Sequence, residues 1–164
     1  MSTEVQGKVF EVLDKLHISY QVTRHPEVFT IEDMENLNME HIEKVAKNLF
    51  VRDDKKRNYY LLVIQKDKIA NLKELQLQIG CRRLSLANEN DLNELIGLNK
   101  GEVTPFGVLN DSNNVVTVIL DKDLKNSEFI GVHPNDNTAT VWISVNDLIK
   151  VLDYANHKIV FVDL

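Results

Sequence analysis

Two apolar runs joined by a short polar segment constrain the fold of this chain more than any other feature. The runs cover residues 48–52 and 59–65, and the six residues between them read Asp-Asp-Lys-Lys-Arg-Asn. So short a polar segment leaves no room for a helix, while β-branched and aromatic side chains favour strands. The sequence therefore predicts a β-hairpin, and with it a sheet on which the rest of the chain must pack.

The other segments predict a mixture of helices and strands. Helical spacing of apolar residues runs over residues 5–16, and helices are predicted over 72–79 and 89–96, each ended by a glycine. Ser144 is the predicted N-cap of a helix over 145–154. Further strands are predicted at 18–23, 115–120, 128–132, 138–143 and 158–162. We expect one α+β domain over residues 1–164, with a mixed, mostly antiparallel sheet flanked by helices.

Charge and hydropathy exclude several classes of protein. A net charge of −6 argues against a surface that coats nucleic acid nonspecifically, so any RNA contact should be local and DNA is not an expected partner. The candidates for RNA contact are Lys44, Lys47, Arg52, Lys55, Lys56, Arg57, Arg82 and Arg83, unless these are solvated surface charges. No apolar run approaches the ~20 residues of a membrane span, and we expect a cytoplasmic protein.

His133 is the first candidate for chemistry. It is followed by Pro134 and a run of turn formers, which places an imidazole at the end of a strand where the chain bends sharply. Such an imidazole either serves the fold as a hydrogen-bond donor and acceptor or acts on a ligand. The residues alone leave both interpretations open.

Lys47 and Asn48 lie where the hairpin begins. An ammonium at neutral pH suits holding a phosphate or a developing oxyanion rather than taking a proton. We interpret Lys47 as a clamp for an anionic group, with a surface lysine of no special role as the alternative.

Residues 101–107 read Gly-Glu-Val-Thr-Pro-Phe-Gly, which is neither a dinucleotide fingerprint nor a P-loop. Gly101 permits backbone torsions and close approach that other residues resist, while Pro105 stiffens the segment. The loop could therefore present backbone N–H groups to a ligand oxygen, or it could simply turn the chain.

Other chemistries find little support. Cys81 beside Arg82 and Arg83 could have a lowered thiol pKa, but no histidine is near in sequence to act as its base. There is no Gly-x-Ser-x-Gly elbow, and the histidines do not occur at ligand spacing, so neither a metal nor a cofactor is implied. Residues 121–123 begin like a calcium loop but lack its later glycine and glutamate, and we interpret them as a turn.

Together, Lys47-Asn48, residues 101–107, His133-Pro134 and the segment His25-Pro26-Glu27-Val28-Phe29-Thr30 resemble the aminoacyl-tRNA deacylase family that includes YbaK and the ProX-type prolyl-tRNA editing proteins. The resemblance spans roughly residues 25–157. It implies a barrel-like sheet and a hydrolase that removes alanine from mischarged tRNA for proline. A pocket built for proline loses only ~1–3 kcal/mol per missing methylene when alanine binds, so a second site must remove the error.

The resemblance also implies roles for individual residues. Lys47 and His133 are the catalytic residues, and the substrate-binding residues are Asn48, Gly101, Pro105, Phe106, Gly107, Val28 and Phe29. Lys47 would hold phosphate or ribose oxygens, loop N–H groups would stabilise the oxyanion, and His133 would orient the substrate or a water. The family is thought to use the ribose hydroxyl beside the ester. The implied partners are the acceptor end of alanine-charged tRNA(Pro) and, as a further candidate, prolyl-tRNA synthetase.

Two alternatives stay open. Asn135-Asp136 stands where a less polar pair is expected in the alanine branch, so the chain could instead remove cysteine, as the YbaK type does. The second alternative is a noncatalytic module, which is a binding protein rather than an enzyme. It would bind aminoacyl-tRNA, or an amino-acid-like ligand, through the same cleft.

Overall fold

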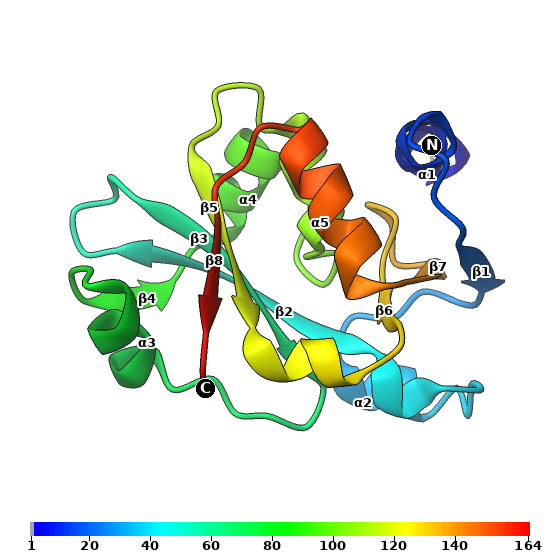
Figure 1. Cartoon of the computed structure of the whole chain (residues 1–164), viewed down its shortest axis with the longest axis horizontal. Coiled ribbons are helices and arrows are strands. Elements are labelled where there is room, and N and C mark those ends of the chain that lie inside the picture. The colour runs from blue at the N-terminus through cyan, green and yellow to red at the C-terminus, as the bar shows by residue number, and fades with distance from the viewer. Residues whose placement is uncertain (1) are drawn as a thin grey trace.

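The computed structural model describes residues 2–164 and is built around a five-stranded sheet with strand order β4-β2-β3-β5-β8 (Figure 1). Its strands are β2 (Ala46–Asp53), β3 (Tyr59–Gln65), β4 (Leu84–Leu86), β5 (Val116–Asp121) and β8 (Ile159–Val162). The β2–β3 hairpin is antiparallel, with Phe50 opposite Leu61, and β4 pairs antiparallel with β2. β5 and β8 run parallel to β3. The predicted hairpin is confirmed.

A second, three-stranded sheet has the order β1-β7-β6 and is antiparallel throughout. Its strands are β1 (Gln21–Arg24), β6 (Ile130–Val132) and β7 (Ala139–Ile143). An isolated bridge between Val45 and Gly131 joins it to the start of β2. A Cβ on Gly131 would lie 2.6 Å from the ring of Trp142, so only glycine allows this close approach.

Residues 2–164 also form five α-helices and three 3₁₀ segments, of which α1 precedes the first strand and the others lie between strands. They are α1 (Ser2–Lys15), α2 (Ile31–Glu35), α3 (Leu72–Ile79), α4 (Glu89–Ile96), α5 (Val145–Tyr154), η1 (Ile42–Lys44), η2 (Pro105–Asn110) and η3 (Lys122–Asn126). The predicted caps are present: Ser144 accepts a hydrogen bond from the Asp147 N–H at 3.1 Å, and Gly80 and Gly97 end their helices in the left-handed region. Among residues 2–164, no helix combines the length and apolar character needed to cross a bilayer.

The five-stranded sheet is covered on both faces. Leu61 and Val63 of β3 pack with α5, α4 and η2, whereas Leu62 and Ile64 on the opposite face pack with Leu75 of α3. A strand buried on both faces has no polar side, which explains the uninterrupted apolar run in β3.

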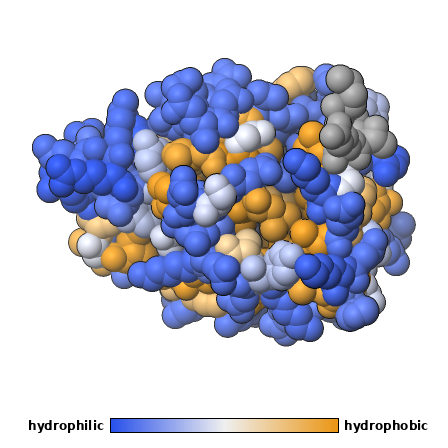
Figure 2. All heavy atoms as spheres, turned by 90° about the horizontal axis from the view of Figure 1, so that it is seen from above, coloured by the Kyte–Doolittle hydropathy of each residue, from blue (hydrophilic) through white to orange (hydrophobic). Residues whose placement is uncertain are grey.

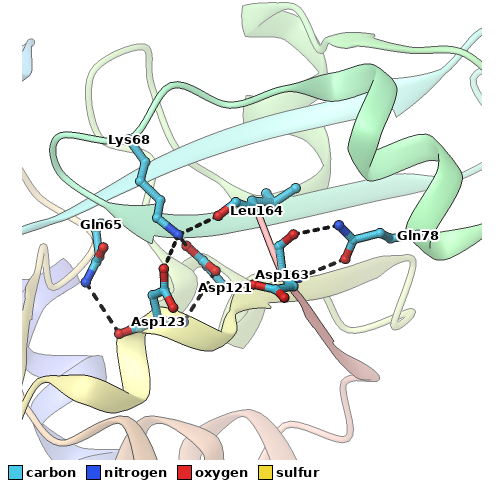
Figure 3. Close-up of polar contacts among 7 residues, drawn as sticks. All are labelled: Gln65, Lys68, Gln78, Asp121, Asp123, Asp163 and Leu164. Carbon is cyan, nitrogen blue, oxygen red and sulfur yellow. Dashed lines mark hydrogen bonds and ion pairs between the residues drawn. The ribbon is translucent and has the colours of Figure 1, made fainter.

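The ends of β3, β5 and β8 are tied together by Lys68 (Figure 3). Its ammonium donates to Asp121 Oδ2 at 2.5 Å, to Asp123 Oδ2 at 2.5 Å and to the carbonyl oxygen of Leu164 at 2.6 Å. Burial opposes the charge on Lys68, but the hydrogen bonds to Asp121 and Asp123 outweigh it and raise its pKa. The segment interpreted as a plain turn is therefore the start of η3, held by an ion-pair cluster.

The expected α+β fold with a mixed, mostly antiparallel sheet is confirmed, but "barrel-like" describes it only loosely. The five-stranded sheet runs from an edge at β4 to an edge at β8 and does not close. The strands predicted in succession at β5, β6 and β7 divide between the two sheets, because η3 carries the chain from one to the other.

Candidate active site at the start of strand β2

A cavity of about 190 Å³ opens where the two sheets meet. The start of β2 forms one side of it, the segment from Val28 into α2 forms another, and Gly101, Val103 and His133 complete its lining. Chain segments far apart in sequence thus contribute to one hollow, which combines polar groups with an apolar wall.

His133 follows β6 and has one ring nitrogen fixed. Nδ1 lies 2.9 Å from the carbonyl oxygen of Ala139, and because a carbonyl can only accept, Nδ1 carries the proton. Burial lowers the pKa of His133, although the hydrogen bond to Ala139 partly opposes this effect. The ring is neutral at neutral pH, so Nε2 presents a lone pair. Among residues 2–164 this nitrogen has no hydrogen-bond partner.

A second histidine stands beside the first. The rings of His25 and His133 meet edge to face with centroids 6.0 Å apart. His25 is held by the carbonyl oxygen of Pro26 at Nδ1 and by Thr140 Oγ1 at Nε2, each at 2.9 Å. Both of its nitrogens are occupied, so His25 supports the position of His133 rather than offering a free group.

Lys47 and Asn48 occupy the second and third positions of β2, opposite Ile64 and Val63. Within the described part of the chain, the Lys47 ammonium forms no ion pair. The Asn48 amide oxygen is buried without a hydrogen-bond partner. An unpaired buried acceptor costs roughly 1–3 kcal/mol, so this oxygen is an unusual feature that a bound donor would relieve.

Gly101 fits the cavity wall because it lacks a side chain. Its φ is +86°, in the left-handed region, and a Cβ would lie 2.8 Å from Cδ1 of Phe29. Phe29 itself is 57% exposed and lies in the lining, whereas Val28 is buried and donates its N–H to the Asn137 carbonyl at 3.2 Å. The Asn137 side chain returns a bond of 2.8 Å to the Val28 carbonyl.

Pro105, Phe106 and Gly107 lie outside the cavity lining, although substrate binding was predicted for them. All three are buried at the start of η2, and the site of a Cβ on Gly107 is 2.8 Å from Leu98. They pack against the core because the 3₁₀ turn directs them inward. The loop reaches the site instead through Thr104, whose hydroxyl donates to the His133 carbonyl at 2.6 Å.

The other predicted site residues do line the cavity: Lys47, Asn48, Gly101, His133, Val28 and Phe29. Their chemical roles remain predictions. Sequence reasoning gave no role to His25 or Thr104, and no local pattern distinguishes a supporting hydroxyl or imidazole from an exposed one. Asn135 and Asp136 are buried in the β6–β7 turn, where Asp136 accepts from the Thr138 N–H at 2.8 Å, and neither lines the cavity.

The described part of the structure adds no support for a reactive Cys81 or for a metal site. Burial raises the pKa of the Cys81 thiol, which is the opposite of what a reactive thiolate needs. Within residues 2–164, no three His, Cys, Asp or Glu side chains gather closely enough to share a metal ion.

The sequence matches a known family of proteins. The sequence model of the aminoacyl-tRNA editing domain covers residues 25–151, so the chain belongs to the aminoacyl-tRNA editing domain family. It is 45% identical to the prolyl-tRNA editing protein ProX of Acetoanaerobium sticklandii over 93% of both chains. It is 35% identical to prolyl-tRNA synthetase associated domain-containing protein 1 of Danio rerio, over 94% of this chain and 84% of the relative.

Solved structures share the fold at lower sequence identity. A candidate trans-editing enzyme for prolyl tRNA synthetase superimposes with a TM-score of 0.72, at 17% identity, over 98% of this chain and 97% of the other. The hypothetical protein APE2540 also gives 0.72, at 20% identity, over 94% and 98%.

Proposed function

We propose that this chain is an aminoacyl-tRNA deacylase that acts in trans on mischarged tRNA for proline, with alanine as the amino acid removed. The observation that carries the proposal is the cavity at the start of β2. It brings together the unpaired ammonium of Lys47, the unpaired amide oxygen of Asn48 and the lone pair on His133 Nε2. Support for the substrate comes from the 45% identity to a prolyl-tRNA editing protein.

The terminal adenosine would enter between Lys47 and Gly101, with its ester toward His133. In hydrolysis a water oxygen bonds to the ester carbonyl carbon, the bond from that carbon to the ribose oxygen breaks, and the proton released ends on the ribose oxygen. Lys47 would offset the negative charge on the phosphate or the developing oxyanion. His133 Nε2 accepts a hydrogen bond from the attacking water or from the neighbouring ribose hydroxyl, which orients it.

Asn48 is suited to the amino group of the substrate. An α-ammonium has only donors, and the buried amide oxygen of Asn48 is an acceptor without a donor. The apolar wall, which includes Val28, Phe29 and Met34, would surround the small side chain of the amino acid. Size selection by such a wall discriminates between amino acids, and proline would be rejected because its ring needs more room.

The test is deacylation of alanyl-, cysteinyl- and prolyl-tRNA(Pro) by the purified protein. We expect loss of alanine, little loss of proline, and strongly reduced rates in Lys47→Ala and His133→Ala. Lys8→Ala and His17→Asn change a lysine and an exposed histidine outside the lining and should keep the wild-type rate. Faster release of cysteine than of alanine would move the chain to the cysteine-specific type. Binding without release of any amino acid would support the noncatalytic module instead.

A further inference from the structure

The tip of the β2–β3 hairpin concentrates positive charge in an acidic protein. Residues 52–57 and 82–83 contain six basic and two acidic side chains, although the whole chain carries a net charge of −6. The two segments are neighbours because Asp53 pairs with Leu84 across β2 and β4. In Figure 2 the projecting left end, where the β2–β3 loop of Figure 1 lies, is covered by hydrophilic residues.

The tip is a fixed turn rather than a loose loop. The buried carboxylate of Asp53 accepts from the Arg57 N–H at 2.9 Å and from Asn58 Nδ2 at 2.8 Å. Burial alone would raise the pKa of Asp53, but these hydrogen bonds outweigh it and lower the pKa. Lys56 adopts a φ of +55°, as the tight turn requires. The side chains of residues 54–58 are therefore held outward, and all are exposed.

Some of the basic side chains have protein partners and others do not. Arg82 donates to both carboxylate oxygens of Asp54, at 2.6 and 3.0 Å, and Arg52 donates to the Asp53 carbonyl at 2.9 Å. Among residues 2–164, no carboxylate pairs with the four exposed cations that remain, which are Lys55, Lys56, Arg57 and Arg83. Three unpaired cations on a rigid turn, with Arg83 beside the turn, favour a polyanionic partner.

Strand β2 connects this tip to the cavity. Lys47 is at its start and Asp53 at its end, which six strand steps of 3.3 Å place about 20 Å apart. A nucleic acid whose 3′ end enters the cavity has further phosphates within that reach. We infer that the hairpin tip, defined as Lys55, Lys56, Arg57 and Arg83, binds the sugar-phosphate backbone of the RNA whose aminoacylated end occupies the cavity.

This inference rests on the proposed function for its partner, an aminoacylated RNA. It adds the protein surface against which the rest of that RNA lies. An anionic protein surface fits the tip less well, because residues 53–58 contain no apolar or aromatic side chain to anchor a protein interface. Phosphate contacts need no such anchor, and they are independent of sequence. The tip therefore contributes affinity and orientation, while the cavity reads the amino acid.

The experiment compares the wild-type protein with the triple variant Lys55→Gln/Lys56→Gln/Arg57→Gln in binding uncharged tRNA(Pro) over a range of salt concentrations. We expect affinity to fall by at least about tenfold at ~100 mM salt, and the slope of log K against log salt to become less steep by roughly 0.7–0.9 for each lost phosphate contact. The control Lys8→Gln/Lys122→Gln/Lys150→Gln removes the same charge from α1, η3 and α5 and should bind as the wild type does.

A second readout uses alanyl-tRNA and a short alanylated oligonucleotide that ends in the same adenosine. The triple variant should be slower than the wild type on subsaturating alanyl-tRNA and equal to it on the oligonucleotide. Unchanged tRNA affinity with an unchanged salt slope overturns the inference, as does loss of binding to prolyl-tRNA synthetase with tRNA binding intact. If the wild type deacylates nothing but the slope still changes in the triple variant, the RNA contact stands and the proposed function fails.

Discussion

Replacing Asn48 with leucine should make the protein more stable and less active. The Asn48 amide oxygen is buried in the cavity wall and has no hydrogen-bond partner, although the residue lies beside Leu49 and opposite Val63. Leucine has nearly the same shape and removes the unpaired acceptor. Stability and function thus make opposite demands on one side chain, as expected where a site is built to receive a donor from outside.

The size of the effect follows from the cost of that acceptor. An unsatisfied buried polar group costs roughly 1–3 kcal/mol, and the lower end applies because the Asn48 side chain is only partly buried. We expect the free energy of unfolding to rise by about 1 kcal/mol, which for a chain of this length raises Tm by roughly 2–4 °C. Urea and thermal unfolding followed by circular dichroism measure the first effect, and alanyl-tRNA(Pro) deacylation measures the second.

Asn137→Leu is the matched comparison. It removes another buried asparagine near the same cavity, but this one donates from Nδ2 to the Val28 carbonyl at 2.8 Å. Here the substitution strands a buried carbonyl and should lower stability by about 1–3 kcal/mol. The reasoning is refuted if Asn48→Leu destabilises the protein to the same degree as Asn137→Leu, because the Asn48 oxygen would then be satisfied in the free protein.

Three further predictions address other parts of the site and fold. Gly101→Ala should lower the free energy of unfolding by roughly 1–3 kcal/mol, because alanine at φ +86° is strained and its Cβ meets Phe29 at 2.8 Å. In the double variant Gly101→Ala/Phe29→Ala, unfolding measurements should show that part of this lost stability is recovered. Because burial lowers the pKa of His133, the unfolded state binds its proton more readily. Stability should therefore fall as pH drops below about 6.5, and it should fall less in the His133→Gln variant. An equal loss of stability in the variant and the wild type would contradict this prediction. Lys68→Met should cost about 3–5 kcal/mol at pH 7 because Asp121 is fully buried beside it, while Lys68→Arg should cost less in the same urea titration.

The parts of the fold that the sequence predicts are those that depend on near neighbours. The hairpin, the helices ended by Gly80 and Gly97, and the Ser144 cap all rest on residues within a few positions of one another. The parallel pairing of β3 with β5 joins strands more than fifty residues apart, and no local pattern specifies it. Apolar strands covered on both faces look alike wherever they lie in a sheet, so their order is set by packing.

The same limit applies to the site. Lys47, Gly101 and His133 were suggested by motif resemblance, and the structure places them around one cavity. The motif could not separate Gly101, which meets Phe29 at the cavity wall, from Phe106, which is buried in the core five residues later. That difference arises where η2 begins, and it depends on contacts with distant residues such as Leu98.

The β6–β7 turn links the imidazole to the apolar wall. The Ala139 carbonyl fixes the tautomer of His133, and the Asn137 side chain holds the Val28 carbonyl, so residues two positions apart set both groups. The Thr138 carbonyl also accepts from the His25 N–H at 3.0 Å. A change in this turn should therefore shift the imidazole and the wall together. It follows that substitutions at Asn137 should alter rate and amino-acid preference jointly, although the Asn137 side chain does not line the cavity.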